Sequence, residues 1–107
     1  MTTVGIFINM IHELPLNAKL NFIINDITYY PYNISLIPNS HIQIGLQARL
    51  TEDKYLNNIT DIITQNNLDN NIRIHIMYNG YRFVIDFIDI IQLTDNGIII
   101  FYLFRYY

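Results

Sequence analysis

Three histidines carry the side chains best suited to metal or acid–base chemistry. His41 and His75 occupy the polar faces of two expected strands, and His12 follows the apolar N-terminal stretch. Two imidazoles and a nearby carboxylate can hold a zinc ion, but the chain has no cysteine and no HxH or HExxH spacing. We therefore expect surface histidines, no metal and no other cofactor.

Carboxylates and hydroxyls give no catalytic pattern either. Asp86 and Asp89 are close enough in sequence for paired acid–base work, but Asp86 is expected opposite Arg73 in a hairpin and Asp89 near a bulge. The only serines, Ser35 and Ser40, lie outside any GxSxG motif, and the four glycines are isolated. We assign no catalytic residue and favour a protein that is not an enzyme.

Aromatic side chains are the remaining candidates, and they gather in two segments. Base stacking on aromatic rings needs a basic groove, whereas the six Lys and Arg residues are scattered over a chain of net charge -3. Tyr and Phe are also favoured at protein interfaces. We rank core or dimer packing first, a protein partner second and nucleic acid third. The expected partner or dimer interface comprises Tyr29, Tyr30, Tyr32, Tyr102, Phe104, Tyr106 and Tyr107.

Composition narrows the class of protein. A chain of 107 residues that is 51% hydrophobic and 14% charged fits one folded domain over 1–107 and excludes disorder. Its 23 Ile and 14 Asn have A/T-rich codons, as in the genomes of many viruses and mobile elements. The N-terminus lacks a positive region, and no run approaches the roughly 18 apolar residues of a spanning helix. We expect no membrane association and a cytoplasmic location.

The N-terminal part is expected to consist of strands. We expect a strand over 3–8, then a short helical turn that ends at Pro15, and alternation predicts a further strand over 19–25. A turn at Asn25-Asp26 leads into an extended aromatic strand over 27–37.

The middle of the chain carries the clearest periodic patterns. Pro31 favours an edge position for the strand that contains it. Residues 41–50 alternate strictly between apolar and polar side chains, which indicates a half-buried strand. Thr51 is an expected N-cap, and the apolar stripe that follows predicts a helix over about 52–65.

Asn79-Gly80 is the strongest hairpin signal in the chain. A two-residue turn places Tyr78 opposite Tyr81 and continues, by register, to an opposite-charge pair of Arg73 with Asp86. A second turn at 94–97 introduces a last strand, 98–107, that is apolar on both faces and therefore central, covered or an interface.

These elements predict an α+β fold. We expect an antiparallel or mixed β-sheet of about five to seven strands, one amphipathic helix on one face and a C-terminal three-strand meander. The apolar last strand needs to be covered, so we expect a homodimer.

Residues 5–15, GIFINMIHELP, resemble the start of a viral protein family. The family is the small viral ring nucleases, which are anti-CRISPR proteins that degrade cyclic tetra-adenylate. The matches are Ile8-Asn9-Met10-Ile11 and Leu14-Pro15, and Asn70-Asn71-Ile72-Arg73-Ile74 resembles a later turn and strand of that family. The resemblance implies a viral anti-defence role.

The chain departs from that family at its ligand-contacting positions. The family's leading Asn and its Ser fall on Val4 and Phe7, and its Gly-His loop falls near Leu50-Thr51-Glu52, where no His is present. These departures argue against the family's nuclease activity here. The candidate ligand-binding residues are Asn9, Arg49 and Arg73.

We therefore expect a small, non-catalytic binding protein encoded by a virus or mobile element. It would act as an anti-CRISPR or other anti-defence inhibitor by protein–protein contact, with a host defence complex as its partner. One alternative is a ring-nuclease-like protein that binds or cleaves cyclic oligoadenylate, and another is a virion or accessory structural protein.

Overall fold

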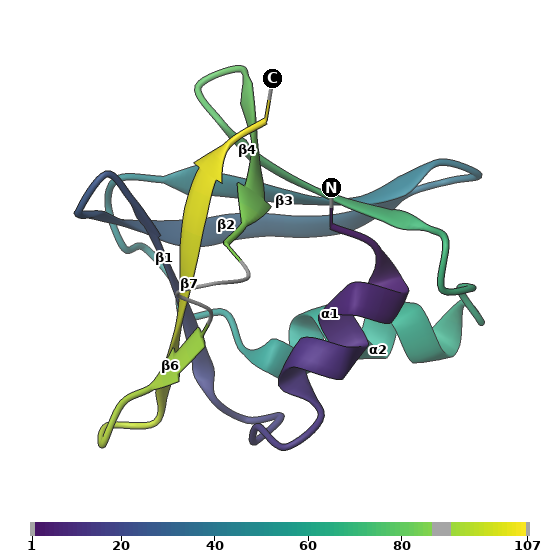
Figure 1. Ribbon diagram of the computed structural model, residues 1–107, viewed down its shortest axis with the longest axis horizontal. Helices are drawn as coiled ribbons and strands as arrows, with labels where there is room; N and C mark the ends of the chain where they lie inside the picture. The colour runs from purple at the N-terminus through teal and green to yellow at the C-terminus, as the bar shows by residue number, and fades with distance from the viewer. Residues whose placement is uncertain (1, 87–90, 107) are drawn as a thin grey trace.

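The structure is a computed structural model that describes residues 2–86 and 91–106. Within these residues the chain forms two helices and seven strands, so the fold is α+β with a mixed sheet, as expected (Figure 1). One helix was expected, near residues 52–65, and the helix at residues 4–11 was not. The elements are α1 (Val4–Ile11), β1 (Lys19–Ile24), β2 (Ile27–Ile37), β3 (His41–Gln47), α2 (Leu56–Gln65), β4 (Arg73–Tyr78), β5 (Tyr81–Ile85), β6 (Ile91–Leu93) and β7 (Ile98–Arg105).

Six of the seven described strands close into a barrel. The strands follow the order β1-β2-β3-β4-β5-β7, and β7 pairs in parallel with β1 to complete the circle. The β3–β4 pair is also parallel, and the other pairs are antiparallel. The expected three-strand meander is not confirmed, because β5 and β6 both pair with β7 while β7 also closes against β1. The bulge expected after Asp86 lies outside the described residues.

Helix α1 occupies the segment 3–8 for which a strand was expected, so that prediction is wrong. The Thr3 hydroxyl accepts a hydrogen bond from the Ile6 amide at 3.4 Å and caps the helix. The alternating, β-branched sequence favoured a strand, but the buried side chains recur at spacings of three and four, which is the period of a helix. They are Val4, Phe7 and Ile11.

The segment before α1 also explains where the β4–β5 hairpin ends. The hairpin register has Tyr78 opposite Tyr81 and Ile76 opposite Phe83, as the Asn79-Gly80 turn predicts. Beyond the Ile76–Phe83 pair, the N-terminal segment lies beside β4 where β5 would otherwise pair. The Ile74 amide donates a hydrogen bond to the Thr2 carbonyl at 2.9 Å. Arg73 consequently pairs with Thr3, and the expected Arg73–Asp86 cross-strand pair is wrong.

Helix α2 begins at Leu56, later than the predicted 52. The backbone before it runs beside β1: the Leu20 amide donates to the Lys54 carbonyl at 3.0 Å, and the Leu56 amide donates to the Ala18 carbonyl at 2.9 Å. These bonds hold the segment extended, so Thr51 is not the N-cap. The apolar stripe is confirmed by the buried residues Leu56, Ile59 and Ile63.

Two strands differ in detail from the predicted pattern. Strand β3 ends at Gln47, and Leu50 is exposed rather than inward-facing. Strand β2 pairs with β1 over its first three residues and with β3 from Tyr30 onward, with a register shift between Pro31 and Asn33. Pro31 therefore lies just after the point at which β2 leaves β1, and it pairs with β3 only, so the edge position expected for it is confirmed.

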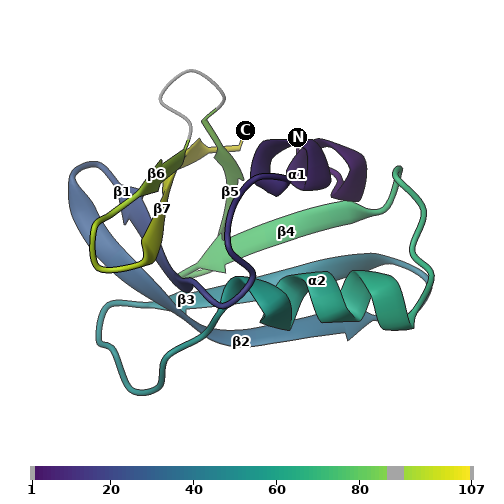
Figure 2. The ribbon, with the colours of Figure 1, turned by 90° about the horizontal axis from the view of Figure 1, so that it is seen from below.

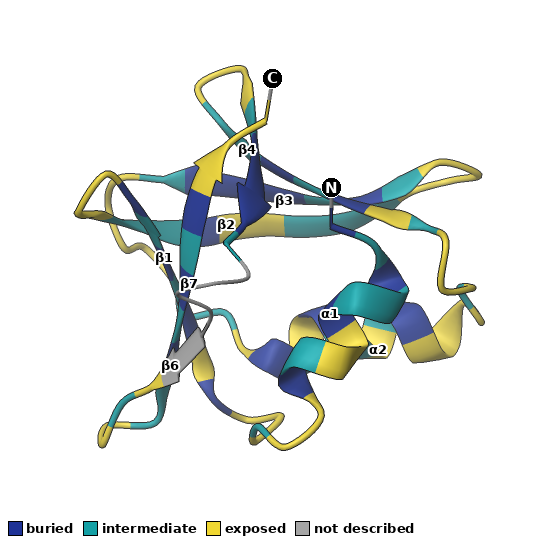
Figure 3. Ribbon diagram, viewed as in Figure 1, coloured by how far each residue is buried: buried dark blue, intermediate teal, exposed yellow. Residues whose placement is uncertain are grey.

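The core lies between the barrel wall and the two helices (Figure 3). At its centre the Phe101 ring lies 5.8 Å from the Phe7 ring of α1 and 5.3 Å from the Phe22 ring of β1. All three side chains are at most 1% exposed. The stack therefore joins the first helix to the two strands that close the barrel.

Substitution of Phe101 tests this packing. We expect Phe101→Ala to lower the free energy of unfolding by about 3–5 kcal/mol, because it leaves a cavity between two rings. Phe104→Ala, on the same strand but 50% exposed, is the matched control and should cost less than about 1 kcal/mol. Urea denaturation measures both, and equal losses would contradict the packing described.

Candidate functional site

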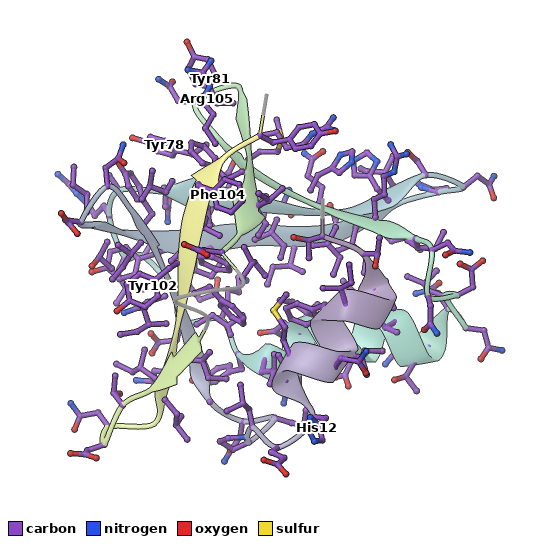
Figure 4. The ribbon with its side chains drawn as sticks, in the orientation of Figure 1. His12, Tyr78, Tyr81, Tyr102, Phe104 and Arg105 are labelled. Atoms are coloured by element: carbon purple, nitrogen blue, oxygen red, sulfur yellow. The ribbon has the colours of Figure 1, made fainter. Side chains whose placement is uncertain are left out.

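A pocket of about 550 Å³ opens at one end of the barrel. Three segments form it: the β1–β2 turn, the β4–β5 turn and the last residues of β7. Tyr78, Tyr81, Phe104 and Arg105 gather around this end (Figure 4). The lining residues are Ile24, Asn25, Tyr29, Tyr78, Asn79, Tyr81, Phe83, Phe104 and Arg105.

Turn chemistry and barrel closure place these three segments together. Both turns have two residues with positive φ, 49° and 66° at Asn25 and Asp26 and 53° and 82° at Asn79 and Gly80. Turns of this geometry match the twist of the strands that they join. The parallel pairing of Ile24 with Leu103 then sets the first turn beside the end of β7.

Aromatic residues make up more than half of the described pocket lining, and two of their rings are in contact. The Tyr29 and Tyr78 rings lie 4.4 Å apart at an angle of 52°. The Arg105 guanidinium carbon lies 3.9 Å from the centre of the Tyr81 ring, a cation–π contact. Tyr81 and Phe104 are nevertheless 48% and 50% exposed, so both still present apolar surface to a partner.

The lining residues suit binding better than chemistry. Among the described lining residues, the ionisable side chains are those of Arg105 and three tyrosines, Tyr29, Tyr78 and Tyr81. Apolar rings with a few amide groups are typical of sites that bind an apolar or planar group and orient it.

The predicted interface residues divide between this pocket and other places. Tyr29 and Phe104 line the pocket. Tyr102 lies farther along β7 and is half-buried (Figure 4). Tyr107 lies outside the described residues. The other three lie outside the pocket lining. The Arg82 guanidinium carbon is 5.4 Å from the centre of the Tyr106 ring, and Tyr30 pairs with Gln47 of β3. The Tyr32 ring lies close over Gly45, where an added Cβ atom would be 2.9 Å from the ring.

Sequence reasoning missed Tyr78, Tyr81 and Arg105 as site residues. The hairpin register did place Tyr78 opposite Tyr81, and an aromatic pair beside an exposed turn is a usable signal for a binding surface. The role of Arg105 had no local signal, because it depends on β7 lying next to β5.

The three candidate ligand-binding residues do not form one site. Asn9 is exposed on α1, and Arg73 begins β4 opposite His41 at the start of β3. Arg49 follows the other end of β3, so the length of that strand, about 20 Å, separates it from Arg73. Whether any of the three binds a ligand stays a prediction.

His41 and His75 form a stacked pair on the outer face of β3 and β4. Their ring centres lie 3.9 Å apart, both side chains are half-buried, and the Ser40 hydroxyl lies 2.7 Å from His41 Nδ1. His12 is exposed, whereas His41 and His75 are surface residues that partly cover each other. Within residues 2–86 and 91–106, no three potential metal ligands of the His, Asp, Glu or Cys type gather.

Burial lowers the pKa of His75 to about 4, with further lowering by the nearby His41, Arg82 and Arg73. The ordinary value of 6.5 applies in the unfolded chain. Between these two values the unfolded chain binds a proton that the folded protein does not. The folded state therefore loses stability as the pH falls through this window.

The pH dependence of stability tests the His75 environment. We expect the free energy of unfolding, measured in urea, to fall between about pH 6.5 and about pH 4 in the native protein. His75→Gln cannot gain this proton and should show a shallower fall, whereas exposed His12→Gln should behave as the native chain. Parallel curves for the native protein and His75→Gln would contradict the burial described.

No protein-family model, curated protein or solved structure matches this chain. No helix in the described part of the chain is both long enough and apolar enough to cross a membrane.

Proposed function

We propose that this chain is a small, non-catalytic binding protein that engages a protein partner through the aromatic pocket. The observation that carries the proposal is the cluster of Tyr81 and Phe104, both about half exposed, at the mouth of a 550 Å³ cavity. Exposed aromatic rings beside a pocket are typical of the residues that dominate binding energy at protein interfaces.

The volume and lining of the pocket limit which groups of a partner can bind in it. A cavity of this volume accommodates one or two apolar or aromatic side chains from another protein. The A/T-rich composition and the N-terminal resemblance favour a virus or mobile element as the source. We therefore propose a host defence complex, such as a CRISPR effector, as the partner, and inhibition by occupancy as the mode of action.

Pocket variants test this function. We expect affinity capture from host cells to retain a defence protein with the native chain, and calorimetry with that purified partner to give its Kd. Tyr81→Ala and Phe104→Ala should each raise the Kd by at least about tenfold, because each removes an anchor at the pocket mouth.

Leu50→Ala is the matched control. Leu50 is 50% exposed but follows β3 and does not line the pocket, so its substitution should leave the Kd unchanged. Circular dichroism checks that every variant is folded. A partner that binds the two pocket variants as tightly as it binds the native chain would refute the proposal.

A second candidate function is the binding of a cyclic oligoadenylate. It is favoured by the Arg105 guanidinium over Tyr81 and by the other rings of the pocket, since bases stack on aromatic side chains. Titration of the native chain with cyclic tetra-adenylate decides it. Binding that Tyr81→Ala abolishes would support this function, and absence of binding would remove it.

A further inference from the structure

The second half of β2 has a strand on one side only. Residues 27–29 pair with β1, whereas the segment from Tyr30 to Ile37 pairs with β3. No strand among the described residues pairs with the other edge of this segment. Figure 2 shows β2 along the lower margin of the molecule, with α2 beside it and no further strand beyond.

Apolar side chains on this segment remain incompletely covered. Ile34 and Leu36 face the core, opposite Ile44 and Ile42 of β3, and are only half-buried. Their partners on β3 are 1% and 0% exposed. On the segment, Tyr32 is 52% exposed and Ile37 is 37% exposed. The edge therefore leaves both backbone and apolar surface that an added strand would cover.

Protection against further pairing stands only at the ends of this segment, where Pro31 with its register shift begins it and Pro38 follows it. Natural edges carry charged side chains, prolines or bulges that prevent pairing with another chain. Here Pro31 and the adjacent register shift stand at the start of the segment, and the residues that follow, Tyr-Asn-Ile-Ser-Leu-Ile over 32–37, contain no charge.

We propose that this edge is a homodimer interface at which β2 pairs antiparallel with β2 of a second copy. A two-fold axis places the same strand on both sides, so each copy meets an uncharged, apolar segment like its own. No like charges face each other across this edge, although each copy carries a net charge of -3. A partner strand with charged side chains is not favoured, because residues 32–37 carry no charge that it could pair with.

The proposed dimer interface lies on β2 and not on the last strand, where the sequence predicts it. Both edges of β7 are already paired, one with β1 and the other with β5 and β6, so β7 cannot add a strand. An interface made mainly of one strand pair is smaller than the roughly 1,200–2,000 Å² of stable complexes, so we expect a dimer with a Kd of about micromolar order.

Sedimentation equilibrium of the full chain tests the proposal. The native protein should show a reversible monomer–dimer equilibrium. Ser35→Lys and Ser35→Glu should each raise the dimer Kd by at least about tenfold, because the two-fold axis brings two like charges close together. Asn33→Lys, at an exposed position on the same face, is a second variant in case substitution at Ser35 prevents folding.

Mixing the two Ser35 variants gives the sharpest result. Ser35→Lys and Ser35→Glu, each largely monomeric alone, should form a heterodimer because the charges at the axis are then opposite. Leu16→Lys, at a position 53% exposed in a loop far from this edge in sequence, should dimerise as the native chain does. A monomeric native protein, or dimerisation unaffected by the β2 substitutions, would overturn the proposal.

Discussion

The parallel pairing of β1 with β7 is the interaction on which the rest of the structure depends. It joins Lys19–Ile24 to residues 98–103, near opposite ends of the chain, over six consecutive residue pairs. Parallel pairing of such distant segments has a high loop-closure cost that local turns cannot offset. The stack of Phe22, Phe101 and Phe7 beneath the pair buries the apolar surface that stabilises the closure.

Both proposed surfaces follow from this closure. Because β1 and β7 are in register, the Asn25 turn lies next to the end of β7, and the aromatic pocket forms between them and the β4–β5 turn. Because β1 pairs with β7 along its full length but with β2 at only three residue pairs, it leaves the remainder of β2 without a neighbour on that side. One pairing thus creates a concave site and an open edge.

Local patterns predicted much of the fold and little of the site. Alternation and turn chemistry correctly placed the strand at 19–25 and the register from Tyr78–Tyr81 to Ile76–Phe83, since both depend on residues close in sequence. Helix α1 was missed because its β-branched residues favour a strand, and packing of Phe7 on Phe101 overrides that preference. The pocket needed the β1–β7 and β5–β7 pairings, for which no local pattern exists.

Backbone nuclear Overhauser effects between β1 and β7 in the folded protein report this strand pairing directly. We expect cross-strand contacts in a parallel register, with Leu20 near Ile99 and Phe22 near Phe101, together with ring–ring contacts between Phe22 and Phe101. Absence of these contacts, or an antiparallel pattern between the two strands, would contradict barrel closure and with it the pocket and the open β2 edge.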